Sequence, residues 1–315
     1  MKKQFVAKLQ EGDKVNDYFV ATRKDLRDTQ SGGKFLGMVF KDRTGEIGGV
    51  QWNNAVSAAS LFEVGDVVNV RGTVTSYQSR LQIRVDQALP IKEDEYSLAD
   101  LVAAPDDSDT TLDSLKKVLE TVHDESLAAL LNAFLNDSVF MGQFVKAAAG
   151  KRWHHAYPGG LLRHTYEVAR IAEGMCELFP NIDHDLLLTA VFMHDIGKIE
   201  EMSHDLFVDY TNAGKLIGHL IIGVEMVRKK IETIPGFPEK LQMQIIHCIL
   251  SHHGELTNGS PIVPKTLEAV VLSHCDNLDA QTEAITRVVR ETKDNHQAWS
   301  EYLQPIERMI WTKEG

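Results

Sequence analysis

Five histidines and two aspartates follow one another in a fixed order through the C-terminal two-thirds of the 315-residue chain. They are His164, the adjacent pair His194-Asp195, His219, the adjacent pair His252-His253, and Asp276. Imidazole and carboxylate are the ligands of hydrolytic metal sites, and this many groups suffice for two ions that share a bridging carboxylate. A single histidine on an apolar helix face is most often a core residue. A metal site is therefore predicted from the whole set and not from any one member.

The segments around these side chains have helical periodicity. His164 follows Pro158-Gly159-Gly160 and shares an apolar stripe with Leu161 and Val168. The pair His194-Asp195 ends an apolar run that Gly197 stops. Asp276 also lies in an apolar row, where a buried carboxylate is costly unless it is paired or holds a metal. These patterns predict a helical bundle whose ligands point inward from five helices.

The motifs resemble a known family. His164, then His194-Asp195 within the letters HDIGK, then Asp276, is similar to the signature of the HD phosphohydrolase superfamily. The added His219, and His252-His253 within SHHG, resemble its two-metal branch, which includes nucleases and cyclic-dinucleotide phosphodiesterases. With a small β domain in front, nearly the whole chain resembles the bacterial 3′-to-5′ exoribonucleases of the YhaM type.

The resemblance implies a division of the ligands between two ions. One ion would be held by His164, His194, Asp195 and Asp276, and the second by His219, His252 and His253, with Asp195 as the bridge. It implies manganese or cobalt, while such a ligand set also accepts iron, nickel or zinc. A water between two such ions has its pKa lowered enough to attack phosphorus near neutral pH, and the ions offset charge on the phosphoryl oxygens.

Two other residues are candidates for contact with the substrate. Lys198 follows Asp195 by one helical turn, and we predict that it contacts the scissile phosphate. The alternative for Lys198 is a solvated lysine at a helix end. His155, in the sequence RWHHAYPGG, is a candidate for contact with the substrate phosphate or the leaving group.

Residues 1–90 have the pattern of β structure. Turn residues separate five short β-rich runs, which are Val15 to Thr22, Phe35 to Lys41, Glu46 to Trp52, Val67 to Ser76 and Leu81 to Ala88. Five strands with the sequences TGEI and VGDVVNVRGTV resemble an OB-fold, a small barrel that binds oligonucleotides. The residues predicted to stack bases or neutralise phosphates are Trp52, Tyr77, Arg71, Arg80 and Arg84. The alternative for the aromatic residues is barrel core, which we favour for Phe40 and which stays open for Trp52 and Tyr77.

Charge is divided unevenly along the chain. The net charge of −12 would make a poor polyanion binder. Residues 1–90, however, carry 13 Lys and Arg against 10 Asp and Glu, while the rest carries 20 against 35. The small domain is thus the basic one, although a slightly basic surface by chance is the plain alternative.

The predicted organisation is multidomain, with an all-β OB-fold followed by an all-α HD bundle. We expect the OB-fold at 1–90, an acidic linker with one short helix at 91–113, and the HD domain at 114–315. The tail from Thr282 to Trp311 is expected to be helical. Its residues Tyr302, Ile306 and Trp311 would tether it to the bundle or to a second subunit of a homo-oligomer.

Composition points to the cytoplasm. No run approaches the roughly 20 apolar residues of a membrane span, and the start, MKKQF, is not that of a secretory signal. Cys176, Cys248 and Cys275 are odd in number and widely spaced, which favours a reducing compartment over a disulfide framework.

The function predicted from these observations is a metal-dependent exonuclease for single-stranded RNA or DNA. That the 3′ end enters first is implied only by the resemblance. A small-nucleotide or cyclic-dinucleotide phosphohydrolase is the second possibility, although Gly254-Glu255-Leu256-Thr257 lacks the longer motif of the cyclic-dinucleotide branch. A nucleic-acid binding protein with an inactive HD domain is the third, and complete retention of the expected ligands disfavours it. A di-iron oxygenase would leave the β barrel unexplained.

Overall fold

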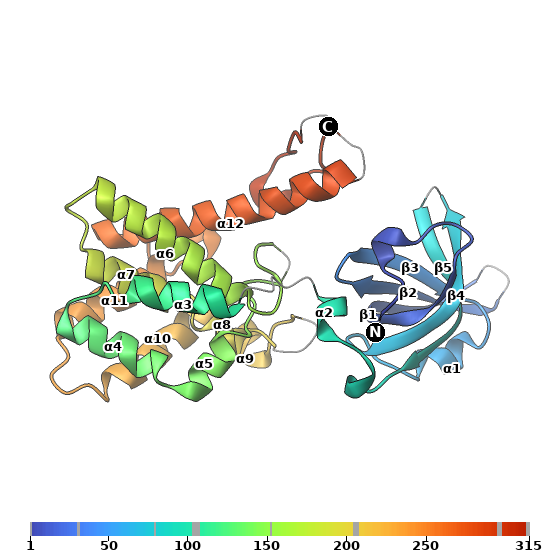
Figure 1. Cartoon of the computed structure of the whole chain (residues 1–315), viewed down its shortest axis with the longest axis horizontal. Coiled ribbons are helices and arrows are strands. Elements are labelled where there is room, and N and C mark those ends of the chain that lie inside the picture. The colour runs from blue at the N-terminus through green and yellow to red at the C-terminus, as the bar shows by residue number, and fades with distance from the viewer. Residues whose placement is uncertain are drawn as a thin grey trace. The chain divides into compact units, whose positions relative to one another are not determined.

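The computed structural model describes residues 2–29, 32–78, 80–102, 108–151, 153–203, 208–294 and 298–312. They form two compact units, of which the first lies within Met1–Ala104 and is built of strands, and the second is built of helices (Figure 1). An all-β unit followed by an all-α unit confirms the predicted fold class.

The first unit is a closed barrel of five strands. They are β1 (Lys14–Asp28), β2 (Lys34–Asp42), β3 (Gly45–Gln51), β4 (Val67–Tyr77) and β5 (Arg80–Pro90), in the order β1-β2-β3-β5-β4. All pairs are antiparallel except β3 with β5. Inward residues alternate with outward ones, and Phe40 is fully buried, as predicted. A Cβ at Gly49 would collide with the Phe40 ring, so this glycine makes room for it.

Short helices surround the barrel strands. They are η1 (Val6–Lys8), α1 (Ala55–Ala59), η2 (Glu93–Glu95) and α2 (Leu98–Leu101). The next helix, α3 (Ser108–Leu119), begins inside the acidic segment that the sequence suggests as a linker.

The second unit is a bundle around the helix α7 (His184–Met193). Its other elements include α4 (Glu125–Leu135), α5 (Ser138–Phe144), α6 (Gly160–Leu178), α8 (Lys198–Glu201), α9 (Asn212–Leu216), α10 (His219–Ile231), α11 (Glu239–Ser251), η3 (Leu256–Asn258) and α12 (Leu267–Asp294). From Leu186 to Met193 every residue of α7 is buried, as expected for a helix that is apolar all round.

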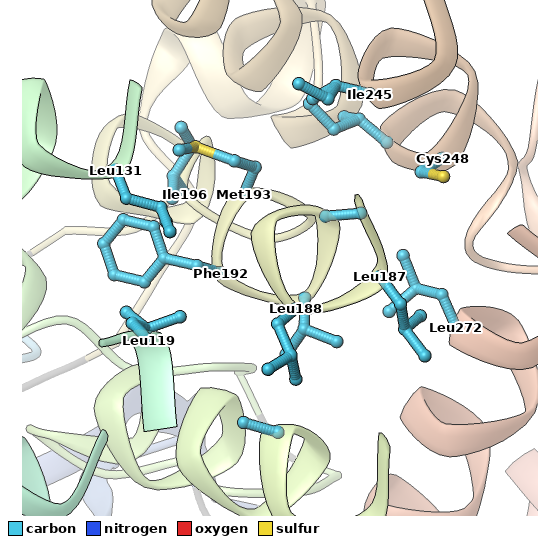
Figure 2. Packing of buried hydrophobic residues seen from close by; sticks show 14 of the residues in the cluster. Leu119, Leu131, Leu187, Leu188, Phe192, Met193, Ile196, Ile245, Cys248 and Leu272 are labelled. Carbon is cyan, nitrogen blue, oxygen red and sulfur yellow. The ribbon is translucent and has the colours of Figure 1, made fainter. Parts of the chain in front are cut away.

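Side chains of α7 reach several neighbouring helices. Figure 2 shows Phe192 beside Leu119 of α3 and Leu131 of α4, and Leu187 beside Leu272 of α12. This packing fixes the C-terminal end of α7, where the pair His194-Asp195 follows, in the interior of the bundle.

The C-terminal tail differs from the prediction of a continuous helix to Trp311. After α12 the described residues form antiparallel bridges between Trp299 and Trp311 and between Leu303 and Arg308, around η4 (Gln304–Ile306). Pro305 has no backbone N–H to extend an α-helix, which accounts for the short 3-10 turn. Ile306 is buried, whereas Tyr302 and Trp311 are more than half exposed, so of these three side chains only that of Ile306 packs into the chain. Within the described ranges, none of the helices has the length and apolar character needed to span a membrane.

Candidate metal centre

All seven predicted ligands meet in the interior of the helical unit. His164 lies in α6, His194 and Asp195 follow α7, His219 begins α10, His252 and His253 follow α11, and Asp276 lies in α12. Five helices or their ends thus contribute, as the periodicity predicts. Their donor atoms form two adjacent clusters.

The first cluster consists of His164, His194, Asp195 and Asp276, whose donor atoms all lie within 4.8 Å of one another. Nε2 of His164 is 3.1 Å from Nε2 of His194 and 3.1 Å from Oδ1 of Asp276. Oδ2 of Asp195 lies 3.4 Å from Nε2 of each of these two histidines. Two imidazoles and two carboxylates therefore converge on one point.

The second cluster consists of His219, His252 and His253. Nε2 of His219 is 3.2 Å from Nε2 of His253. The other carboxylate oxygen of Asp195, Oδ1, lies 3.4 Å from Nε2 of His252 and 3.6 Å from Nε2 of His219. Asp195 therefore turns one oxygen to each cluster, which is the geometry of a bridging carboxylate.

Each of the five histidines uses its Nδ1 for an oxygen outside the clusters. The acceptors are Asp279 Oδ2 for His164, Val191 O for His194, Glu201 Oε1 for His219, Ile249 O for His252 and Asn258 O for His253, at 2.6–3.1 Å. Because these oxygens accept, Nδ1 carries a hydrogen and Nε2 is the nitrogen that faces inward, as in metal-bound histidine.

This tautomer pattern tests whether the residues fit a metal. Nε2 atoms lie 3.1 Å apart in one cluster and 3.2 Å apart in the other, and such a pair needs a positive charge between its nitrogens, either a proton or a metal ion. Oδ1 of Asp195 is also buried without a hydrogen-bond partner among the described residues. Both observations, with the mixed imidazole and carboxylate donors, fit two divalent ions.

The electrostatics of the two clusters differ. Burial acts to lower the pKa of His164, but hydrogen bonds to Asp195, Asp276 and Asp279 outweigh it and hold this pKa well above its ordinary value. Burial, joined by repulsion from His252 and His219, lowers the pKa of His253 to about 3. The carboxylates of the first cluster therefore favour a positive charge there, and the second cluster offers His253 as a neutral imidazole, the form that binds metals.

Two glycines allow the ligand segments to approach closely. A Cβ at Gly197, in the HDIGK sequence, would collide with the carbonyl oxygen of His219 at the start of α10. A Cβ at Gly214 would collide with the backbone of Glu201, the residue that holds Nδ1 of His219. The glycine after His194-Asp195 is thus needed to bring the second cluster to the first.

Lys198 lies against a ligand. Its Nζ is 2.6 Å from Oδ2 of Asp195, and the residue is only 7 % exposed. Burial acts to raise the pKa of Asp195, but the charges of Lys198 and His194 outweigh it and keep that pKa well below its ordinary value. Lys198 thus helps to keep the bridging carboxylate ionised, and contact with a phosphate remains a prediction.

His155 is engaged on both ring nitrogens. Nδ1 lies 2.9 Å from the hydroxyl of Tyr157, and Nε2 lies 3.1 Å from Oδ2 of Asp279, the carboxylate that also holds His164. His155 is 1 % exposed, and Asp279 lies between it and His164 of the first cluster as a shared partner.

Three residues of the centre were not given a role from the sequence. Asp279 shares the apolar row of Asp276 one helical turn away, and that spacing was a usable clue. Glu201 carries no such sign, because it meets His219 only through the packing of α8 on α10. His154 lies beside His164 with two ring nitrogens that have no hydrogen-bond partner in the described part of the chain, and the sequence gives no reason to prefer it to its neighbour His155.

The barrel residues predicted to bind nucleic acid lie at three places. Trp52 is 55 % exposed and its ring lies 4.9 Å from that of Phe35, while Arg84 is opposite Val50 in the β3–β5 pair. Tyr77 and Arg80 face each other at the β4–β5 turn. Arg71 lies on β4, where its Nε donates to Asn16 on β1.

Comparison with known proteins follows the same division. Residues 161–281 match the family model of the HD domain, and residues 20–91 match that of an OB-fold nucleic acid binding domain. The second OB-fold domain of replication protein A from Methanococcus maripaludis is 24% identical over 30% of this chain and 97% of its own, with a TM-score of 0.25. RecG bound to a three-way DNA junction is 13% identical over 75% of this chain and 41% of its own, with a TM-score of 0.22. At these scores neither likeness bears on function.

Proposed function

We propose that this chain, which combines an OB-fold nucleic-acid-binding domain with an HD domain, is a metal-dependent exonuclease for single-stranded RNA. An HD domain indicates a metal-dependent phosphohydrolase, and an OB-fold in the same chain suggests a nucleic acid as substrate. The observation that carries the proposal is Asp195, whose two oxygens lie between two clusters of inward-facing imidazoles. Single-stranded DNA is a second substrate of the same chemistry.

The protein groups divide the work of phosphodiester hydrolysis. His164, His194 and Asp276 hold one side of the centre, His219, His252 and His253 hold the other, and Asp195 spans both. When bound, two divalent ions activate a water as the nucleophile and offset charge on the phosphoryl oxygens. We propose manganese or cobalt, following the family resemblance.

Outer residues keep the ligands in the required orientation. Asp279 and Glu201 fix the tautomers of His164 and His219, and Lys198 keeps Asp195 ionised. Such outer hydrogen bonds also make the imidazoles more basic and thus better ligands.

The barrel supplies affinity for the strand. Trp52 with Phe35 offers an exposed aromatic surface, and Arg84 on the neighbouring strand offers a cation for the backbone. Stacking on aromatics and neutralisation of phosphates bind single strands with little sequence preference. The excess of basic residues in 1–90 supports this role, since the acidic remainder would repel a polyanion.

Exonuclease action is proposed from the family resemblance and from the burial of the ligands, whereas its 3′-to-5′ direction follows from the resemblance alone. A centre enclosed by five helices favours a strand end over an internal segment. We also propose that the enzyme degrades RNA in the cytoplasm. The three cysteines are free thiols, as expected in a reducing compartment.

A circular single strand tests the proposal, because it has no end. We expect the protein with added manganese to release mononucleotides from a linear 20-nucleotide RNA labelled at the 5′ end, with EDTA abolishing the reaction. The sealed circle of the same sequence should remain intact. Equal digestion of circle and line would replace the exonuclease by an endonuclease. Hydrolysis of a cyclic dinucleotide alone would replace the nucleic-acid substrate by a small nucleotide.

A further inference from the structure

His154 stands apart from the other histidines of the metal centre. Both of its ring nitrogens are buried, and neither has a hydrogen-bond partner among the described residues. Its ring lies 5.1 Å from that of His164. A buried polar group without a hydrogen-bond partner destabilises the folded protein. A partner in the working protein is therefore expected.

The charges around His154 are those of the metal centre. Burial, with the charges of Lys198 and His164, lowers the pKa of His154 to about 2, and Asp276 and Asp195 act on it in the opposite direction. In either protonation state the imidazole has at least one N–H donor, so the availability of a donor does not depend on this pKa.

His154 lacks the features of a metal ligand. Each of the five imidazoles in the two clusters donates Nδ1–H to an outer oxygen, as metal-bound histidines almost always do. Within the described ranges His154 has no such acceptor, and its nitrogens belong to neither of the two clusters of donor atoms. The missing partner is therefore better sought in the substrate than in an ion.

The segment that carries His154 is fixed on both sides by α12. Arg287 donates to the carbonyl oxygen of Trp153, and the backbone N–H of His155 donates to Oε2 of Glu283 at 3.1 Å. His155 has a φ of 43°, and a Cβ at Gly160 would collide with its carbonyl oxygen. The ring of His154 is thus presented from a rigid support, as a group that acts on a reacting centre requires.

We propose that His154 is a catalytic residue that donates its ring N–H to a phosphoryl oxygen of the scissile phosphate. The inference rests on the proposed phosphodiester hydrolysis, and it gives His154 the contact for which the sequence suggests His155. Water supplies the oxygen of the new P–O bond and the P–O3′ bond breaks. The 3′ oxygen stays on the shortened strand and takes up the proton that the water loses, while the phosphate leaves with the released mononucleotide. His154 adds one hydrogen bond that stabilises charge on the phosphoryl group.

A ring without nitrogen tests this role. His154→Phe fills the same space, removes the donor and removes a buried polar group without a partner. We expect it to melt at the same temperature as the wild type or higher, to bind the same amount of manganese by mass spectrometry, and to lose about 10²–10³-fold in kcat on a single-stranded RNA. His154→Gln retains an N–H donor and should recover part of the loss. His123→Phe, an exposed histidine on the surface, is the matched control.

A binding measurement separates this inference from the proposed function. Calorimetry with AMP and the manganese-loaded protein should show about tenfold weaker binding for His154→Phe, as for one lost hydrogen bond to a charged group. Loss of manganese from His154→Phe would make His154 a ligand and overturn the inference. Wild-type turnover and wild-type AMP binding in that variant would overturn it too. If the wild type hydrolyses no RNA, the proposed function fails, and the AMP comparison alone still decides the role of His154.

Discussion

The carboxylate of Asp279 lies 2.6 Å from Nδ1 of His164 and so decides which nitrogen of that ring faces the metal centre. Burial acts to raise the pKa of Asp279, but hydrogen bonds from His155 and His164 outweigh it and keep this pKa well below its ordinary value. An ionised Asp279 therefore accepts a hydrogen bond from Nε2 of His155 and from Nδ1 of His164, the nitrogen of His164 that faces away from the cluster. The same arrangement recurs at Glu201 and His219.

Replacement of Asp279 should weaken metal binding without removing a ligand. In Asp279→Asn the amide cannot fix the tautomer of His164 as a carboxylate does, and we expect the affinity for manganese to fall about 10–100-fold. Titration against a chelating dye measures it. Glu173→Gln, which alters only a surface pair with Arg170 on α6, is the control. An unchanged affinity in Asp279→Asn would show that His164 is held in place by packing alone.

Replacement of Asp195 should disable both clusters at once. A neutral amide in Asp195→Asn cannot offer a charged oxygen to each cluster, so bound manganese should fall below two ions per chain and turnover should fall at least about 10²–10³-fold. Mass spectrometry for metals and a chromogenic phosphodiester provide the measurements. Asp113→Asn, an exposed change on α3, serves as the control. Wild-type turnover in Asp195→Asn would rule out the two-metal scheme.

The convergence of the seven candidate ligands could be predicted from sequence, because each lies at a helix end or in an apolar row, where local pattern is informative. Gly197 is a part of the same local pattern. Glu201 could not be predicted, since its role depends on the contact of α8 with α10, and α8 itself is only one turn long. The tail after α12 was wrongly expected to be helical, because composition does not show where bridges such as Trp299 to Trp311 replace a helix.

The barrel prediction concerns where the strand binds. If Trp52 stacks a base, Trp52→Ala should weaken binding of a single strand by roughly 1–3 kcal/mol. The plot of log affinity against log salt has a negative slope, and Arg84→Ala should reduce its magnitude by about 0.7. The same substitution at Arg71 and at Arg80 shows which of the three places on the barrel contacts the strand. Fluorescence anisotropy in EDTA measures both effects. Arg170→Ala, on the helical unit, is the control for loss of one charge. If every barrel variant shows the same salt slope as the wild type, the strand does not bind at these residues of the barrel.

The cysteines should differ in reactivity. Burial raises the pKa of the Cys248 thiol to about 12 and that of Cys275 to about 11, so at pH 8 both remain protonated, and the thiolate is the reactive form. Cys176 is only partly buried, and we expect it to react first with Ellman's reagent in the native protein. Denatured protein should release the signal of all three. Rapid reaction of Cys248 in the native state would contradict the packing of α11.

The division of labour between the two units can be tested by removing the barrel. Residues 108–315 contain α3 and every predicted ligand, so this fragment should retain hydrolysis of a small chromogenic phosphodiester once circular dichroism confirms that it is helical. Its acidic surface should repel a long polyanion, so its kcat/KM on a single strand of about 20 nucleotides should fall well below that of the full chain. Added salt screens the repulsion and should narrow the gap. The fragment 108–315 is thus expected to hydrolyse small substrates far better than long strands. If the fragment and the full chain degrade the strand equally well at the same low salt, the barrel does not deliver the substrate, and the nucleic acid must bind directly on the helical unit.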